Sequence, residues 1–248
     1  MIKLLRLIYL PYQWLIFTPL AIIFTLFFGF LAVILAFVSN AKIASLVGGV
    51  IWAKLIGCLT PIFVSVRGRE NIKANQSYVI ISNHQSFYDI FLIYGWLGID
   101  AKWVMKQELR KIPGLGIGSE KIGHIFIDRS NSNAAISSIN KAKKKIINGT
   151  SIIFFPEGTR KNNALELGAF KKGAFKLALD LKLPILPISI VGTRNILPPS
   201  SAKLFPGKVK LIIHPPIEIQ EYNNENIDSL ILKSREIIKN GIELNNSK

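Results

Sequence analysis

The chain has 248 residues, enough for one large or two small domains with a sizeable buried core. Half of its residues are hydrophobic, and the mean hydropathy of +0.36 is high for a soluble protein of this length. Its single cysteine, Cys58, excludes an intramolecular disulfide and a metal site built from a cysteine cluster.

The net charge of +16 indicates an anionic partner: nucleic acid, anionic lipid, or a small anionic substrate or acidic carrier protein. The sequence contains no zinc-finger, basic-zipper or RNP pattern, which argues against nucleic acid. A hydrophobic N-terminus accompanies the charge, and basic residues beside such a segment favour a lipid surface.

The N-terminal segment is uncharged from Leu7 to Ala41, and its apolar run from Leu15 to Val38 exceeds the roughly 20 helical residues that cross a hydrocarbon core. The run also exceeds the roughly 7–15 residues of a signal-peptide core, and no cleavage-site pattern follows it. We therefore predict that residues 1–60 form a retained, hydrophobic helical membrane anchor.

Basic residues flank the apolar run on both sides, beginning with Lys3 and Arg6 before it and Lys42 after it. This pattern favours both ends on the cytoplasmic side, so we expect attachment to the cell membrane with the rest of the chain on its cytoplasmic face. Helix breaks at Pro11 and Pro19 would suit a re-entrant or in-plane anchor. A single tilted transmembrane helix is the alternative topology.

The stretch 42–59 is a candidate second interfacial helix, although Gly48 and Gly49 weaken that prediction. From residue 61 to 248 short β-rich runs alternate with helical patterns, which predicts an α/β layered domain with a largely parallel or mixed sheet flanked by helices. The predicted strands are 77–82, 101–105, 124–128, 150–155, 184–192 and 208–214, and the predicted helices are 133–149, 168–181 and 226–244.

The stretch SNHQSFYDI, residues 82–90, places His84 five positions before Asp89. On one continuous helix the two side chains would lie about 140° apart, so they can meet only at a strand–turn–helix junction. Ser86 fits the N-cap of such a helix with Asp89 three residues later. A catalytic pair and a simple helix cap with a loop histidine are both compatible with this spacing.

A second polar group follows the strand that ends near Phe155, in the sequence PEGTR. Glu157, Gly158 and Arg160 would leave the carboxyl end of that strand, where open α/β sheets place ligands. Glycine permits close backbone approach, and the arginine fork suits phosphate, although an ordinary surface turn has the same composition. Arg129 follows another predicted strand and could add a second cation. The apolar stretch 183–194 is predicted to be structural or channel-lining.

Taken together, the motifs resemble those of the glycerolipid acyltransferases, the family of 1-acyl-glycerol-3-phosphate acyltransferases. The resemblance covers about residues 60–215. NHQSFYD at 83–89 matches the N-H-x4-D block, GHIFIDR at 123–129 resembles the second block, FPEGTR at 155–160 matches the third, and LPILPISIVG at 183–192 resembles the fourth.

The resemblance implies transfer of an acyl chain from acyl-CoA or acyl carrier protein to the 2-hydroxyl of lysophosphatidic acid, giving phosphatidic acid. His84 would act as general base, oriented by Asp89, in a direct transfer. Arg160, Arg129 and Lys106 would bind the glycerol phosphate, and Glu157 and Gly158 would shape that site. The thioester is a co-substrate, and no metal or further cofactor is expected.

Two alternatives stay open at this point. The same chemistry could act on glycerol 3-phosphate or another lysolipid, since FPEGTR does not separate these acceptors. The chain could instead be a non-catalytic, membrane-anchored lipid-binding protein that uses the same basic surface. The expected partners are membrane lipids, lysophosphatidic acid and the acyl donor, and no nucleic acid.

Overall fold

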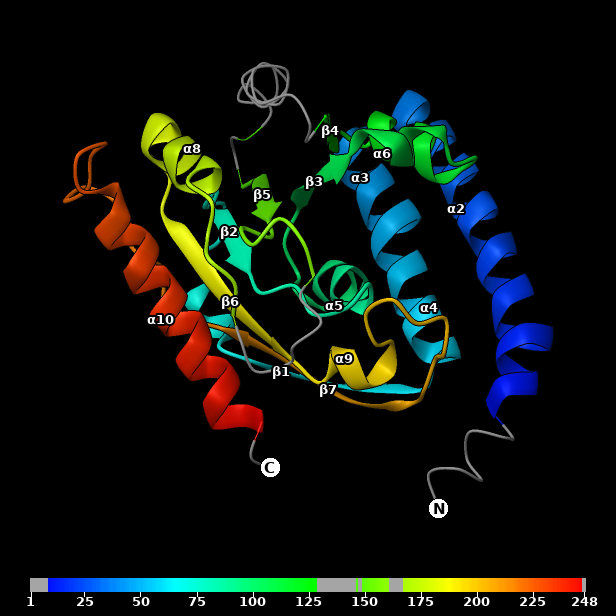
Figure 1. Ribbon diagram of the computed structural model, residues 1–248. Coiled ribbons are helices and arrows are strands. Elements are labelled where there is room, and N and C mark those ends of the chain that lie inside the picture. The colour runs from blue at the N-terminus through cyan, green and yellow to red at the C-terminus, as the bar shows by residue number, and fades with distance from the viewer. Residues whose placement is uncertain (1–8, 129–145, 147–148, 161–166, 247–248) are drawn as a thin grey trace.

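The computed structural model describes residues 9–128, 146, 149–160 and 167–246 (Figure 1). A seven-stranded sheet in the order β1-β7-β6-β2-β5-β3-β4 forms its centre. Adjacent strands are parallel except β6 and β7, which are antiparallel, so the predicted mixed sheet is confirmed. The strands are β1 (Ile62–Arg67), β2 (Val79–Ser82), β3 (Ala101–Lys106), β4 (Ile125–Ile127), β5 (Ser151–Phe154), β6 (Ile185–Val191) and β7 (Gly207–Ile213).

Six of these strands coincide with predicted runs, and β1 is the strand that sequence reasoning missed. It is an edge strand beside β7, and its side chains alternate between half-buried and exposed positions. Phe63, on the outward side, is 68% exposed. Because β1 starts three residues after an apolar helix, its apolar residues resemble a continuation of that helix in the sequence.

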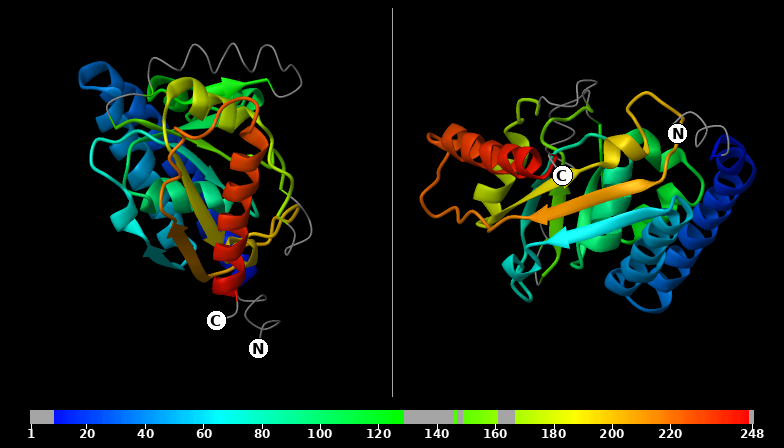
Figure 2. Two further views of the ribbon diagram at one scale, coloured as in Figure 1. Left: turned by 90° about the vertical axis from the view of Figure 1, so that its left-hand side faces the viewer. Right: turned by 90° about the horizontal axis from the view of Figure 1, so that it is seen from below.

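Helices cover both faces of the sheet. Successive residues of a strand point to opposite faces, so neighbouring residues of β2 pack against different helices. Ile80 packs with α5 (Tyr88–Trp96) and the N-terminal helices, whereas Ile81 packs with α8 (Gly173–Leu181) and α10 (Ile227–Asn246). Figure 2 shows α10 and the N-terminal helices on opposite sides of the molecule.

The predicted C-terminal helix is confirmed as α10, and the helix predicted at 168–181 is confirmed from Gly173 onward. The helix predicted at 133–149 lies almost entirely outside the described residues. Short elements between the strands are η3 (Arg69–Asn71), η4 (Gln107–Lys111), α6 (Leu115–Lys121) and α9 (Thr193–Ile196).

The N-terminal segment is helical without interruption from Tyr9 to Val38, so the prediction of breaks at its prolines is wrong. A π-helical turn, η1 (Gln13–Phe17), precedes α2 (Thr18–Val38), which carries Pro19 in its first turn. The wider turn accommodates the missing N–H and the ring of the proline without ending the helix.

A second helical run follows a turn at Ser39 and confirms the helix predicted over 42–59. It consists of α3 (Ala41–Ser45), the π-helical η2 (Leu46–Ile51) and α4 (Trp52–Leu59). Gly48 belongs to the π-helical part, and a Cβ there would lie 2.5 Å from the Cβ of Ala32 on the first helix. The glycine therefore allows the two helices to pack closely as a hairpin.

The hairpin shares one hydrophobic core with the sheet, since Ala32, Ala53 and Ile56 belong to the same cluster as Leu92 of α5. Its outer side, in contrast, exposes large apolar side chains. Both helices are long and apolar enough to cross a membrane, and in the most apolar part of the first helix 17% of the residues are buried. Exposed apolar side chains of Tyr9–Val38 include Trp14, Leu15, Ile16, Ile22, Ile23, Leu26, Phe27, Phe30, Ile34, Phe37 and Val38.

Candidate active site

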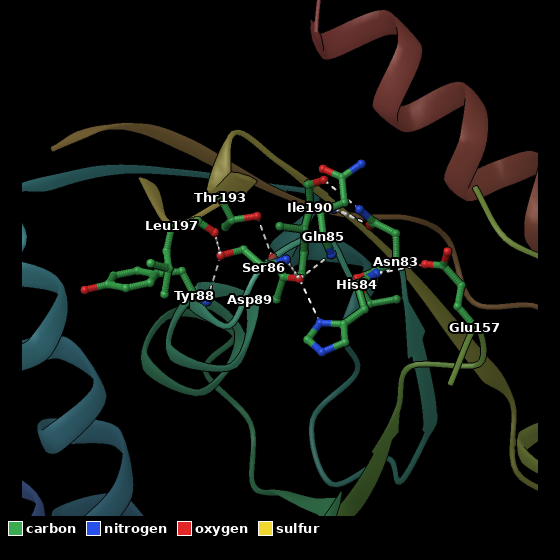
Figure 3. Close-up of polar contacts among 11 residues, drawn as sticks. Asn83, His84, Gln85, Ser86, Tyr88, Asp89, Glu157, Ile190, Thr193 and Leu197 are labelled. Atoms are coloured by element: carbon green, nitrogen blue, oxygen red, sulfur yellow. Dashed lines mark hydrogen bonds and ion pairs between the residues drawn. The ribbon is translucent and has the colours of Figure 1, made fainter. Parts of the chain in front are cut away.

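The strand–turn–helix junction predicted around His84 is present between β2 and α5 (Figure 3). His84 Nδ1 lies 2.9 Å from Asp89 Oδ2, so the predicted contact is confirmed. The aspartate is fully buried, and the histidine side chain is 15% exposed. Because a carboxylate accepts, Nδ1 carries the proton, and Nε2 of the neutral ring is left as an acceptor.

The Asp89 carboxylate is held by several donors besides the imidazole. Oδ2 also accepts from the backbone N–H groups of Gln85 and Ser86, at 2.7 and 2.8 Å. Oδ1 accepts from the Thr193 hydroxyl at 2.5 Å. These donors compensate the buried charge and hold the carboxylate in one orientation.

The cap predicted at Ser86 is confirmed in its hydrogen bonds but not in its position. Ser86 Oγ accepts from the backbone N–H of Tyr88, and Asp89 reaches back to the N–H of Ser86. The helix itself begins at Tyr88 with Phe87 as the N-cap residue, because the first turn bonds back over three residues. Ser86 Oγ donates to the carbonyl of Leu197, so it is engaged on both sides.

The loop that carries His84 is fastened to β6 by Asn83. Its amide accepts from the backbone N–H of Ile190 at 2.8 Å and donates to the carbonyl of the same residue at 2.9 Å. A side chain thus extends the strand pairing beyond the end of β2. Sequence reasoning assigned no role to Asn83 beyond its place in the motif.

Glu157 and Gly158 lie in the turn after β5, next to the histidine loop. One carboxylate oxygen of Glu157 accepts from the backbone N–H of His84 at 2.9 Å, and the other accepts from that of Gly168 at 2.8 Å. Gly158 has a φ of +75°, which other residues rarely adopt. The turn after β5 therefore supports the histidine loop directly.

The imidazole of His84 rests on an aromatic ring. Phe155 stacks on it with ring centroids 3.9 Å apart and an angle of 10° between planes. Trp103 of β3 packs behind Phe155 at 5.7 Å. This apolar floor excludes water from one face of the imidazole, and sequence reasoning did not assign it.

The structure describes two of the three side chains predicted to bind phosphate, and these differ in their position relative to the histidine loop. The Arg160 guanidinium is exposed and lies 5.9 Å from the ring centroid of Phe87, on the edge of the histidine loop. Lys106, at the end of β3, forms an exposed ion pair with Glu108 at 2.9 Å. Arg129 lies outside the described residues. Phosphate contacts of all three stay predictions.

The other two histidines lie outside this cluster. Burial, followed by the neighbouring charge of Lys102, lowers the pKa of His124 to about 3. Burial also lowers the pKa of His214, whose Nε2 lies 2.8 Å from Ser189 Oγ. Both are therefore neutral packing residues near pH 7. Within the described ranges, no three His, Cys, Asp or Glu side chains form a group that could hold a metal ion.

A family model described as Acyltransferase matches residues 63–191, just over half of the chain. The chain belongs to the acyltransferase family. The matched acyltransferase region extends from β1 to the end of β6 and includes His84, Asp89, Glu157 and Arg160. The family resemblance of the sequence motifs is thereby confirmed.

Relatives and a solved structure agree with this acyltransferase assignment. The chloroplastic 1-acyl-sn-glycerol-3-phosphate acyltransferase BAT2 of Brassica napus is 34% identical over 170 residues, covering 67% of this chain and 48% of that protein. The 1-acyl-sn-glycerol-3-phosphate acyltransferase of Saccharomyces cerevisiae is 33% identical over 175 residues, covering 70% and 57%. The chain thus spans about half the length of these curated relatives.

The crystal structure of the 1-acyl-sn-glycerophosphate (LPA) acyltransferase PlsC from Thermotoga maritima matches with a TM-score of 0.83 and 29% identity. The match covers 100% of this acyltransferase chain and 99% of that chain. The likeness therefore includes the N-terminal helices as well as the sheet.

Proposed function

We propose that this chain transfers an acyl group from an acyl thioester to the 2-hydroxyl of lysophosphatidic acid, giving phosphatidic acid. The observation that carries the proposal is the 2.9 Å contact between His84 Nδ1 and the buried carboxylate of Asp89. The names of the plant and yeast relatives and of the Thermotoga enzyme support the acceptor class. The donor is acyl-CoA or acyl carrier protein.

His84 acts as the base through Nε2, since Nδ1 is occupied by Asp89 (Figure 3). Nε2 takes the proton of the 2-hydroxyl as its oxygen attacks the thioester carbonyl carbon. Asp89 stabilises the imidazolium that forms. When the tetrahedral intermediate collapses, the new C–O bond stays, the C–S bond breaks, and the leaving thiolate takes the proton from His84.

Arg160 binds the phosphate of the acceptor in this proposal, and Arg129 and Lys106 add positive charge. The position of Arg160 over Phe87, three residues from His84, supports this role because a phosphate there lies on the same loop as the base. Glu157 and Gly158 shape the site by supporting the histidine loop, and the observed bond between Glu157 and the His84 N–H is the reason for that assignment.

The N-terminal hairpin attaches the protein to the cell membrane, with the catalytic sheet on the cytoplasmic face. The exposed apolar side chains on its outer side support this location, because so many apolar side chains on one surface are costly to expose to water. The net charge of +16 supports contact with anionic lipid and with an anionic donor. Acyl chains of both lipids then approach the site from the bilayer.

A donor-by-acceptor assay on the purified chain tests the proposal. Acyl-CoA and acyl carrier protein are each offered with lysophosphatidic acid, glycerol 3-phosphate and a lysolipid that lacks the phosphomonoester. We expect acylation of lysophosphatidic acid with at least one donor. Preference for another acceptor reassigns the substrate, and the absence of thioester-dependent acylation overturns the proposal.

His84→Ala should abolish turnover while the circular dichroism spectrum stays unchanged. His214→Gln is the matched control, since that imidazole packs against β6 rather than Asp89 and its replacement should leave turnover intact. Full activity in His84→Ala removes this histidine as the base.

A further inference from the structure

Thr193 contacts the carboxylate of Asp89 from the side opposite the histidine loop. Its Oγ1 lies 2.5 Å from Asp89 Oδ1, and both residues are almost completely buried. The two residues are 104 positions apart in the sequence. No motif of the sequence assigns the threonine a chemical role, because it lies just beyond the apolar stretch of β6.

The two oxygens of Asp89 have separate partners. Oδ2 accepts from His84 Nδ1 and from the N–H groups of Gln85 and Ser86. Rotation of the carboxylate about the Cβ–Cγ bond of Asp89 would move both of its oxygens. The Thr193 hydroxyl on Oδ1 opposes this rotation, so it fixes the direction from which Oδ2 meets the imidazole.

The turn before Thr193 is built to place it there. Gly192 has a φ of +93°, and a Cβ at this position would lie 2.4 Å from the backbone carbonyl oxygen of Lys208 on β7. Glycine therefore allows the chain to leave β6 and begin α9 within one residue. Because β6 is parallel to β2, the turn lies at the same edge of the sheet as His84 (Figure 3).

The segment from Ile190 to Leu197, which contains Thr193, forms hydrogen bonds with the histidine loop at two further points. Ile190 pairs with the side chain of Asn83, and the carbonyl of Leu197 accepts from Ser86 Oγ at 2.7 Å. These bonds hold the histidine loop against the end of β6 and the start of α9. Within this segment, Thr193 is the residue that contacts the carboxylate of Asp89.

We propose that Thr193 is a positioning residue of the acyl transfer, acting through Asp89 on the imidazole of His84. The inference rests on the proposed function, because it assigns the threonine to the same general-base step. At 1% exposure the threonine is closed off from solvent, and its hydroxyl proton is donated to Asp89. It therefore acts on the orientation of the base rather than by contact with substrate.

Thr193→Val tests this assignment, because valine keeps the shape of threonine and removes its hydroxyl. The loss of a hydrogen bond to a charged group changes an equilibrium or rate constant by roughly tenfold to hundredfold. We therefore expect kcat of Thr193→Val to fall by roughly this factor. The KM for lysophosphatidic acid should stay within about twofold, since no substrate contact is lost. Thr193→Ser, which restores the hydroxyl, should recover most of kcat.

Thr150→Val is the matched control. Thr150 Oγ1 donates to a carboxylate oxygen of Asp100 at 3.1 Å. Thr150 lies just before β5 begins, whereas Glu157, which contacts the His84 loop, lies beyond the end of that strand. The same kind of bond is therefore lost away from His84. We expect its kcat to be unchanged. If Thr193→Val does not fold, Thr193→Ala takes its place.

A readout without turnover is the proton resonance of the His84 Nδ1–H, identified by its absence in His84→Ala. It should shift or broaden in Thr193→Val and return in Thr193→Ser. An unchanged resonance and kcat in Thr193→Val overturn the inference, as does an equal loss in the serine variant. If no acyl transfer is found but the resonance responds to Thr193, the proposed function fails, whereas the action of Thr193 on the imidazole through Asp89 stands.

Discussion

The carboxylate of Glu157, beyond the end of β5, accepts a 2.9 Å hydrogen bond from the backbone N–H of His84, beyond the end of β2. The same side chain also accepts from the N–H of Gly168. A glutamine has one oxygen, and its NH2 group would face one of these two donors. We therefore expect Glu157→Gln to lower kcat by roughly tenfold because a displaced loop misplaces the base.

Steady-state kinetics with saturating donor measures this effect. Glu243→Gln is the matched control, because Glu243 forms an exposed pair with Lys239 on α10, and its kcat should not change. Equal activity of Glu157→Gln and the wild-type protein would show that the histidine loop holds its position without this contact.

Arg160 is expected to act on acceptor binding. Arg160→Ala should raise the KM for lysophosphatidic acid by roughly tenfold or more, because an ionic hydrogen bond to phosphate is lost. Arg160→Lys should recover part of the affinity, since an ammonium group cannot form the paired bonds of a guanidinium. Arg67→Ala, at the exposed end of β1, should leave KM unchanged. A KM for Arg160→Ala equal to that of the control would contradict the phosphate role.

The burial of His124 makes folding stability depend on pH. Its pKa is lowered to about 3 in the folded protein, against about 6.5 in the unfolded chain. The unfolded state therefore binds a proton that the folded state excludes between these values. The stabilisation is complete above about pH 6.5 and is lost as the pH falls toward 3.

His124→Asn removes this titration while keeping an acceptor for the backbone N–H of Trp103. At pH 5 the wild-type protein should have lost about 2 kcal/mol through this group relative to pH 7, and the variant should lose correspondingly less. Denaturant unfolding at both pH values measures the difference. Identical pH dependence in the two proteins would contradict the buried, neutral state of His124.

Membrane attachment is expected to depend on the outward side of the hairpin. The double variant Ile23→Asp, Phe30→Asp places charges on two exposed apolar positions of α2. Burying one such side chain contributes about 1.5–3 kcal/mol, so binding to anionic liposomes should weaken more than tenfold. Leu232→Asp, on α10 at the opposite side of the molecule, should still co-sediment (Figure 1). Unchanged sedimentation of the double variant would locate the lipid contact elsewhere.

Local patterns predict much of the fold and the central pair. Six strands have apolar runs bounded by turn residues, and the spacing of His84 and Asp89 excludes one helix and requires a junction. The prolines were misjudged because a local rule ignores the π-helical turn at Gln13–Phe17. β1 was missed although Pro61 separates it from α4, because the largely apolar stretch from Ile62 to Val66 continues the hydrophobic composition of the helix before it.

Contacts that depend on strand order were beyond sequence reasoning. Thr193 and Asn83 join the site because β6 lies next to β2, although more than 90 residues separate these strands. Thr193 had a usable signal: like Glu157, it follows the carboxyl end of a buried strand. Applying that rule to every strand would have selected it. Phe155 also follows the end of a buried strand, but it has no polar group that would mark it as functional, and its stacking on His84 depends on how the turn after β5 folds.

The core shared by the hairpin and the sheet also affects how the protein can be handled. Trp14 and Trp52 lie on the hairpin, whereas Trp96 and Trp103 lie on the sheet and its covering helix. Because Ala53 and Ile56 pack in one cluster with Leu92, a chain cut before β1 would lose the cover of α5 as well as the proposed lipid contact. The two N-terminal helices are therefore part of the folded domain and not a separate anchor joined to it by a linker. A detergent that displaces them from α5 should also abolish catalysis.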